Sequence, residues 1–260
     1  FVTPAHDGAM ELGVEHHDGW VSLTLNRPEV RNALNTASLG RIAATLKQLA
    51  ADDLCHVVVI TGAQGHFAAG ADIGEIEHKT QAEAALDLRK QHWADIRAFP
   101  KPMIAAVDGF ALGGGFELAL MADLIVLGPT ARLGLPETTL GLIPGAGGGQ
   151  RLMSLVGRMR ASRMTLMGEV IDAATAFDWG IASHLAAGPA FPDAKALAEK
   201  ISQRAPRAMT AAKQALIAGS EASLAFATER SGFELLMDSA DKAEGVAAFR
   251  AKRPPRFTGR

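Results

Sequence analysis

Residues 103–117 read MIAAVDGFALGGGFE, and this segment says more than any other about how the chain folds. Its first five residues, Met103–Val107, are all apolar and predict a buried β-strand. After a short loop, three glycines open a helix predicted over Gly113–Met121. The first amides of a helix have no partner within it, and without Cβ atoms a ligand oxygen can approach them closely. The segment therefore predicts donors that stabilise negative charge on a carbonyl oxygen.

A second turn of the same character follows the strand predicted at Val57–Thr61. That strand is a continuous β-branched run, as in a strand buried on both faces. The turn reads Ala69-Gly70-Ala71-Asp72. Either turn alone is explained equally well by tight packing of a helix on a sheet. At the ends of neighbouring parallel strands, however, the two turns would face one ligand site.

The other elements are assigned from periodicity and turn signals. Strands at Leu12–Glu15 and Trp20–Leu25 form a predicted hairpin through Asp18-Gly19. Further predictions are a helix from Thr36, as its N-cap, to about Ala51, a helix over Gln81–Arg97 and a strand at Leu124–Leu127. After about residue 150, apolar residues recur at helical spacing with almost no strand signal, at 151–156, 161–167, 173–179, 194–204, 208–218, 223–237 and 241–250. We expect an α/β core at 1–195 and a helical module at 196–260.

Two glutamates stand beside these turn-forming segments. Glu117 falls in the first turn of the predicted helix, and Glu137 follows Pro136 on a loop. The simpler interpretation is a helix-capping Glu117 and a solvated Glu137. Both lie in apolar, glycine-rich surroundings, where a charged group is costly unless it has a role. We therefore predict that the pair is catalytic.

Composition excludes several classes of protein. A formal net charge of −2 over 260 residues argues against a nucleic-acid partner. The apolar run at 103–128 carries three acids, which argues against a membrane span. One cysteine and scattered histidines predict neither a disulfide framework nor a metal site. With no secretory signal apparent, we expect a soluble protein of a reducing compartment, cytoplasmic in a bacterium or in the mitochondrial matrix of a eukaryote.

Taken together, the segments resemble the enoyl-CoA hydratase/isomerase (crotonase) family. The likeness spans nearly the whole chain, in the family's order. The matching segments are LNRP at 25–28, NAL at 32–34, ITG at 60–62, FAAGADI at 67–73, KPMIAAVDGFALGGGFELA at 101–119, PE at 136–137, GLIPG at 141–145, QRL at 150–152 and EGVAAF at 244–249.

This resemblance implies a crotonase-like α/β spiral of ββα units with a C-terminal helical trimerisation module, assembled as a homotrimer or homohexamer. It implies an acyl-CoA thioester substrate and no separate cofactor, because coenzyme A is part of the substrate. By position, the amides of Ala71 and Gly114 match the family's oxyanion hole. The resemblance also implies contacts with substrate or CoA from Arg31, Ala33, Ala69, Asp72 and Ile73.

Glu117 and Glu137 match the two carboxylates that mark hydratases, which is the ground for predicting an enoyl-CoA hydratase. Fatty-acid β-oxidation is one pathway that uses such enzymes, beside amino-acid and aromatic degradation, and the choice among them is left open. In the family pattern Glu117 is the general base and Glu137 the general acid. Lys252 and Arg253 are further candidates for CoA phosphate contacts from a neighbouring subunit, although solvated charges explain them equally well. Alternatives are another crotonase-family reaction, such as enoyl-CoA isomerisation, and a non-catalytic acyl-CoA- or RNA-binding scaffold. The length of the acyl chain is left open.

Overall fold

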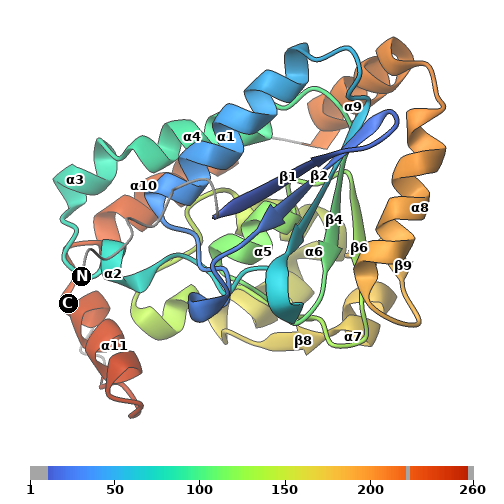
Figure 1. Cartoon of the computed structure of the whole chain (residues 1–260). Coiled ribbons are helices and arrows are strands. Elements are labelled where there is room, and N and C mark those ends of the chain that lie inside the picture. Colours follow the sequence, from blue (N-terminus) through green and yellow to red (C-terminus); the bar gives the residue numbers. More distant parts are fainter. Residues whose placement is uncertain (1–10, 221–222, 257–260) are drawn as a thin grey trace, which may run out of the picture.

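The computed structural model describes residues 11–220 and 223–256, in which the main sheet has six strands (Figure 1). Their order is β1-β2-β3-β4-β6-β9, with β1 antiparallel to β2 and all other pairs parallel. The bounds are β1 (Leu12–His16), β2 (Trp20–Leu25), β3 (Val57–Gly62), β4 (Met103–Val107), β6 (Leu124–Leu127) and β9 (His184–Leu185). The predicted hairpin and the three predicted parallel strands are confirmed.

Strand β3 is buried on both faces, as its composition predicts. Val58 and Ile60 point into the larger core, which is shared with α1 (Thr36–Ala51). Val57 and Val59 point into a second core, formed with α8 (Ala190–Ser202). Figure 1 shows α1 and α8 on different sides of the sheet. The alternation of side chains along a strand thus supplies two cores from one continuous apolar run.

A second, three-stranded sheet is not predicted from the sequence. It consists of β5 (Phe110–Leu112), β7 (Arg132–Gly134) and β8 (Val170–Asp172), in the order β5-β7-β8. Strands of three residues are too short to show an alternating pattern. Strand β5 takes up most of the expected loop between β4 and α5 (Gly114–Ala119), so it is this sheet that positions the start of α5.

Two helix predictions need correction in detail. The N-cap of α1 is Asn35, not Thr36, because the Asn35 side chain accepts a hydrogen bond from the Ser38 amide at 2.7 Å. The helix predicted over Gln81–Arg97 is two helices, α3 (Gln81–Ala85) and α4 (Leu88–Arg97). Asp87 ends the continuity, since its carboxylate accepts from the Arg89 amide and caps α4.

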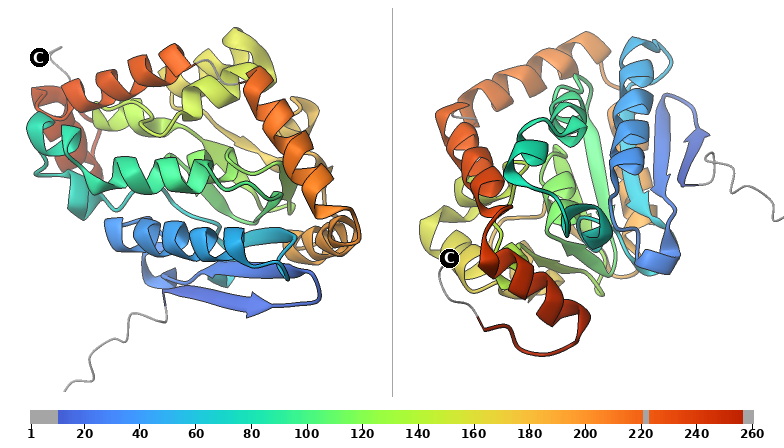
Figure 2. Two further views of the ribbon diagram at one scale, coloured as in Figure 1. Left: turned by 90° about the horizontal axis from the view of Figure 1, so that it is seen from above. Right: turned by 90° about the vertical axis from the view of Figure 1, so that its left-hand side faces the viewer.

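The remaining elements complete the described part of the chain. They are η2 (Pro28–Val30), η3 (Ala63–Gly65), α2 (Ile73–Ile76), η4 (Pro136–Leu140), α6 (Gly148–Leu166), α7 (Ala173–Asp178), α9 (Pro206–Ser220), α10 (Ser223–Leu236) and α11 (Ala240–Arg250). Helix α6 joins two predicted helices across a kink at Gly157, where φ is 75°. Figure 2 shows α9 and α10 crossing one side of the molecule in succession, with α11 after them.

The predicted division between 195 and 196 falls inside α8, which packs on the sheet through Ala190, Ala194 and Ala198. The division, and the role of residues 196–260 in assembly, stay predictions. In the part of the chain that the structure describes, no helix has both the length and the apolar character needed to cross a membrane.

Candidate active site

A cavity of about 650 Å³ lies where the two glycine turns meet the C-terminal helices. All nine site residues predicted from the sequence line it: Arg31, Ala33, Ala69, Ala71, Asp72, Ile73, Gly114, Glu117 and Glu137. Lys252 and Arg253 do not line it, and the Arg253 guanidinium forms an ion pair with Glu244 at 2.6 Å. The predicted residues therefore come together, apart from the two C-terminal cations.

The two turns place backbone amides side by side. A Cβ atom added to Gly114 would lie 3.6 Å from the amide nitrogen of Ala71. The turn before α2 pairs with Leu34 through the Gly70 carbonyl and the Asp72 amide, a pairing that does not use the Ala71 amide. Gly114 is the first residue of α5, so its amide has no acceptor within the helix. The turn also depends on Gly113, whose φ of 48° favours glycine.

Glu117 is held rigidly at one side of these amides. Glu117 is only 4% exposed, and its Oε1 accepts hydrogen bonds from the amides of Ala146 at 2.7 Å and Gly148 at 2.9 Å. Burial raises the pKa of the Glu117 carboxyl, and the amides together with the nearby Arg151 charge offset this effect in part. The carboxylate is therefore a stronger base than that of a solvated glutamate.

Glu137 comes from a different kind of element. It follows Pro136 in the first turn of η4, a short 3-10 helix that ends at Gly141 with φ 71°. A Cβ atom added to Gly113 would lie 3.1 Å from Oε1 of Glu137, so this carboxyl rests against the residue next to Gly114. The residue is partly exposed. Two amides and two carboxyls are thus gathered at one cavity.

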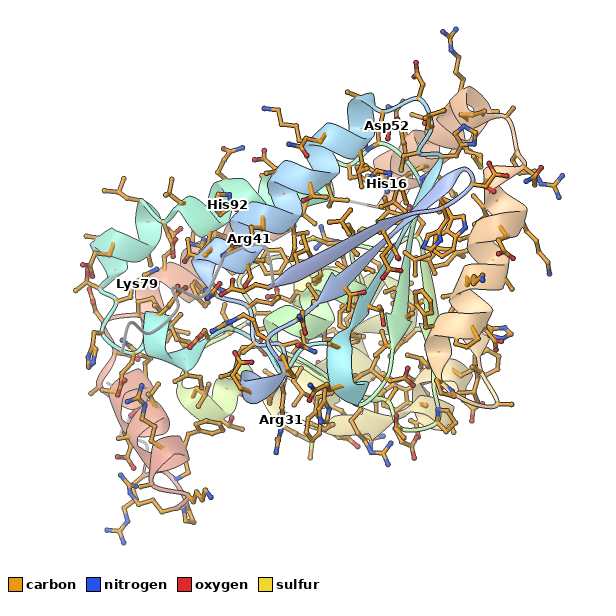
Figure 3. The ribbon with its side chains drawn as sticks, viewed as in Figure 1. His16, Arg31, Arg41, Asp52, Lys79 and His92 are labelled. Atoms are coloured by element: carbon orange, nitrogen blue, oxygen red, sulfur yellow. The ribbon has the colours of Figure 1, made fainter. Side chains whose placement is uncertain are left out.

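Arg31 and Asp72 have structural partners as well as a place in the cavity wall. Arg31 has φ 52° and holds its guanidinium over the Phe110 ring, 5.3 Å from the centroid. Asp72 caps α2 and forms an ion pair with Arg27 at 3.0 Å. Figure 3 shows Arg31 at the turn after β2 and Lys79 just before α3.

The sequence patterns do not single out several other residues that line the cavity. These are Lys79, Asp87, Arg89, Trp93, Arg230, Phe233 and Met237. Arg89 and Trp93 stand four residues apart, the spacing that puts two side chains on one helix face, and this is the only local signal. Nothing in the sequence around Arg230 indicates that it approaches α4.

Known proteins resemble this chain over nearly its full length. A family model described as enoyl-CoA hydratase/isomerase matches residues 15–260. The 2,3-dehydroadipyl-CoA hydratase of Escherichia coli (strain K12) is 47% identical over 258 residues, 96% of this chain and 99% of that protein. A probable enoyl-CoA hydratase of Mycobacterium leprae is 41% identical, covering 98% of this chain and 97% of the relative. A crystal structure of an enoyl-CoA hydratase from Mycobacterium avium subsp. paratuberculosis superimposes with a TM-score of 0.84 at 32% identity, covering 95% of this chain and 98% of the other.

The two-sheet α/β fold with its shared cavity is that of an acyl-CoA enzyme. The chain belongs to the enoyl-CoA hydratase/isomerase (crotonase) family, and it is a hydro-lyase of the enoyl-CoA hydratase type. The crotonase fold predicted from the sequence is therefore confirmed. The roles of individual residues, the reacting substrate and the assembly stay predictions.

Proposed function

We propose that this protein adds water across the double bond of a trans-2-enoyl-CoA to give a 3-hydroxyacyl-CoA. The observation that carries the proposal is the convergence of Glu117 and Glu137 on the cavity that also holds the Ala71 and Gly114 turns. Double-bond isomerisation needs the oxyanion donors but not both carboxyls, and a binding scaffold needs neither carboxyl.

The two amides act first in this mechanism. The Ala71 and Gly114 N–H groups donate to the thioester oxygen and draw electron density from the double bond. The β-carbon becomes electrophilic, and the negative charge that develops on the oxygen is stabilised by donors already in place. One such donor contributes on the order of 10²–10³ in rate. Their position beside each other, in turns fixed by two sheets, supports this role.

The carboxyls then carry the protons. The oxygen of water forms a bond to the β-carbon while ionised Glu117 takes a proton from that water. Protonated Glu137 delivers its proton to the α-carbon, so the thioester carbonyl re-forms and charge is conserved. A raised pKa suits Glu117 to this task, because a general base works best when its pKa approaches the working pH.

The finer context is also part of the proposal. We place the activity in fatty-acid or related acyl-CoA degradation. The substrates that we propose include a short chain that ends in an acid, as in the name of the Escherichia coli relative.

We propose a homotrimer or homohexamer, since exposed apolar side chains such as Met153, Met159 and Leu166 on α6 favour an interface. The curated relatives include bacterial proteins and a human mitochondrial one, which supports the cytoplasm of a bacterium or the mitochondrial matrix.

Loss of the enoyl absorbance of crotonyl-CoA tests the reaction directly. We expect Glu117→Gln and Glu137→Gln each to lower kcat by about 10²–10⁴, the usual contribution of a general acid or base. Glu199→Gln, on the outer side of α8, removes a carboxylate away from the cavity and serves as the control. If Glu137→Gln keeps full turnover, or if a 3-enoyl-CoA is isomerised faster than crotonyl-CoA is hydrated, the proposal is wrong.

A further inference from the structure

The cavity extends past the oxyanion turns toward a group of cations. The indole of Trp93 lies beside the Gly114 turn, with Cζ2 3.7 Å from the position of an added Cβ. Arg89 is four residues earlier on the same face of α4, about 6 Å along the helix axis. An acyl chain that starts at Gly114 and runs along Trp93 therefore reaches the Arg89 side chain, which also lines the cavity.

A second guanidinium approaches Arg89 from another helix. Arg230 projects from α10 into the same end of the cavity, and its charge acts on that of Arg89. The Arg230 side chain is fixed by hydrogen bonds from Nε to Glu234 and from Nη2 to the Ala84 carbonyl, and it lies over the Phe233 ring. Helix α10 lies near α3 and α4 in Figure 1. Two like charges are thus held close together by separate elements.

Cations outnumber acids on this part of the wall. The charged side chains that line it are Lys79, Arg89, Arg230 and Asp87. Asp87 pairs with Lys79 at 2.5 Å. Outside the lining, Glu75 pairs with Arg89, and Glu234 is shared by Arg230 and Lys90 at 2.8 Å each. The sharing of Glu234 between two cations leaves Arg230 incompletely compensated.

Arg89, which lines the cavity, also has N–H donors beyond those that bind Leu34 and Glu75. Its side chain is only 9% exposed, and its hydrogen bonds to the Leu34 carbonyl and to Glu75 both leave from Nη1. Neither bond uses Nε or Nη2. A guanidinium has five N–H donors, and a buried one is stabilised when a planar anion accepts two of them. A carboxylate between Arg89 and Arg230 would accept such bonds and relieve the repulsion between the two cations.

We propose that this end of the cavity is a carboxylate subsite, in which Arg89 and Arg230 bind the terminal acid of a dicarboxylic enoyl-CoA. The inference rests on the proposed function, because it assumes the thioester at the Ala71 and Gly114 turns. A methyl-ended chain of equal length leaves both cations without an anion in a poorly solvated place, which costs binding free energy. The subsite thus selects for the acid at the end of the chain.

Two pairs of ligands of equal length test the subsite. The reactive pair is trans-2-hexenoyl-CoA and its analogue with the terminal methyl replaced by a carboxylate. The saturated pair, hexanoyl-CoA and adipyl-CoA, measures binding by calorimetry without turnover. We expect the acid of each pair to be preferred at least tenfold, in kcat/KM and in Kd. We expect Arg230→Met to abolish that preference through opposite changes in KM, higher for the acid-ended chain and lower for hexenoyl-CoA, because the methyl-ended chain no longer leaves this cation without an anion.

Lys195→Met is the control, because Lys195 is exposed on α8 and pairs with Glu199, and it neither lines the cavity nor contacts Glu234. It should keep the preference for the acid. Equal or weaker binding of adipyl-CoA by the wild type overturns the inference, and so does an equal loss on both chains in Arg230→Met. Crotonyl-CoA is too short to reach the subsite, so its hydration reports on the proposed function alone. If crotonyl-CoA is not hydrated but adipyl-CoA still binds more tightly than hexanoyl-CoA, the proposed reaction is wrong and the proposed subsite stands.

Discussion

Glu117 and Glu137 are the same residue type at one cavity, yet their surroundings differ in almost every respect. Glu117 lies in an α-helix, is nearly inaccessible, and accepts two backbone amides at one oxygen. Glu137 lies on a short 3-10 helix, is partly exposed and rests against Gly113. Two carboxyls that must act in opposite senses, one as base and one as acid, need such unlike environments. The contrast therefore fits a division of roles better than a pair of equivalent groups.

The two glutamates also depend on different parts of the chain. Glu117 is fixed by the turn at 145–148 and the start of α6. Glu137 is carried by η4, on which α11 packs so closely that a Cβ on Gly245 would lie 2.6 Å from the Leu140 carbonyl carbon. Glu117 thus belongs to the central core, whereas Glu137 lies on an element against which the C-terminal helix α11 packs.

The largest effect is expected from removing both carboxyls at once. Groups that act on one transition state are strongly non-additive, so Glu117→Gln/Glu137→Gln should lose little more than the worse single variant, about 10²–10⁴ in kcat. Steady-state kinetics with crotonyl-CoA on the four proteins of the cycle measures the coupling. A double variant whose loss equals the product of the single losses would show that the two glutamates act independently, contrary to the contrast drawn above.

A smaller effect is expected from moving Glu117 without removing it. A Cβ on Gly148 would lie 2.7 Å from Cγ of Glu117, so Gly148→Ala must displace that side chain. Misplacing a catalytic group by about 1 Å costs as much as 10²-fold, and we expect kcat to fall roughly tenfold to a hundredfold. The backbone at 148 is compatible with alanine, but the displaced side chain is buried, so we also expect the free energy of unfolding to fall by about 1–3 kcal/mol.

Gly188→Ala is the control for this variant, because an added Cβ there meets no atom within 4 Å. Kinetics and thermal melts of both proteins should be compared. Normal turnover in Gly148→Ala would mean that the position of Glu117 is not critical.

The sequence predicts those features of the two glutamate environments that depend on residues adjacent in the chain. The β-branched run of β3 and the glycines before α5 each carry their structural meaning in neighbouring residues. Position 113 favours glycine because its φ is positive, and α5 begins at the next residue. The catalytic candidates lie directly beside such signals, which is why Glu117 and Glu137 are predictable.

The parts that sequence does not predict are assembled from distant segments. The strands of the second sheet are three residues long and are stabilised by partners far along the chain. Asp87 divides a helical pattern because a cap outweighs the intrinsic preference for a continuous helix. Arg89 and Arg230 meet only because α4 and α10 fold onto one cavity. Tertiary packing, not local propensity, determines each of these features.

The smallest expected effect concerns stability, and it measures the burial of Glu117 directly. Burial holds its pKa in the folded protein above the value in the unfolded chain, so the folded state binds more protons between those two pH values. The free energy of unfolding therefore falls as pH rises through this interval, by about 1.4 kcal/mol for each unit of the difference. Glutamine does not titrate and escapes this loss, so Glu117→Gln should gain stability relative to wild type from about pH 4 upward.

Urea denaturation of both proteins across this pH range gives the difference between their free energies of unfolding. The contributions of all other titrating groups cancel in this difference. Glu199→Gln controls for the loss of one carboxylate from an exposed helix. A stability difference that stays constant with pH would mean that the Glu117 amide bonds compensate its burial in full. In that case the unequal environments of the two glutamates would not make Glu117 the stronger base, and the assignment of base and acid would have to rest on geometry alone.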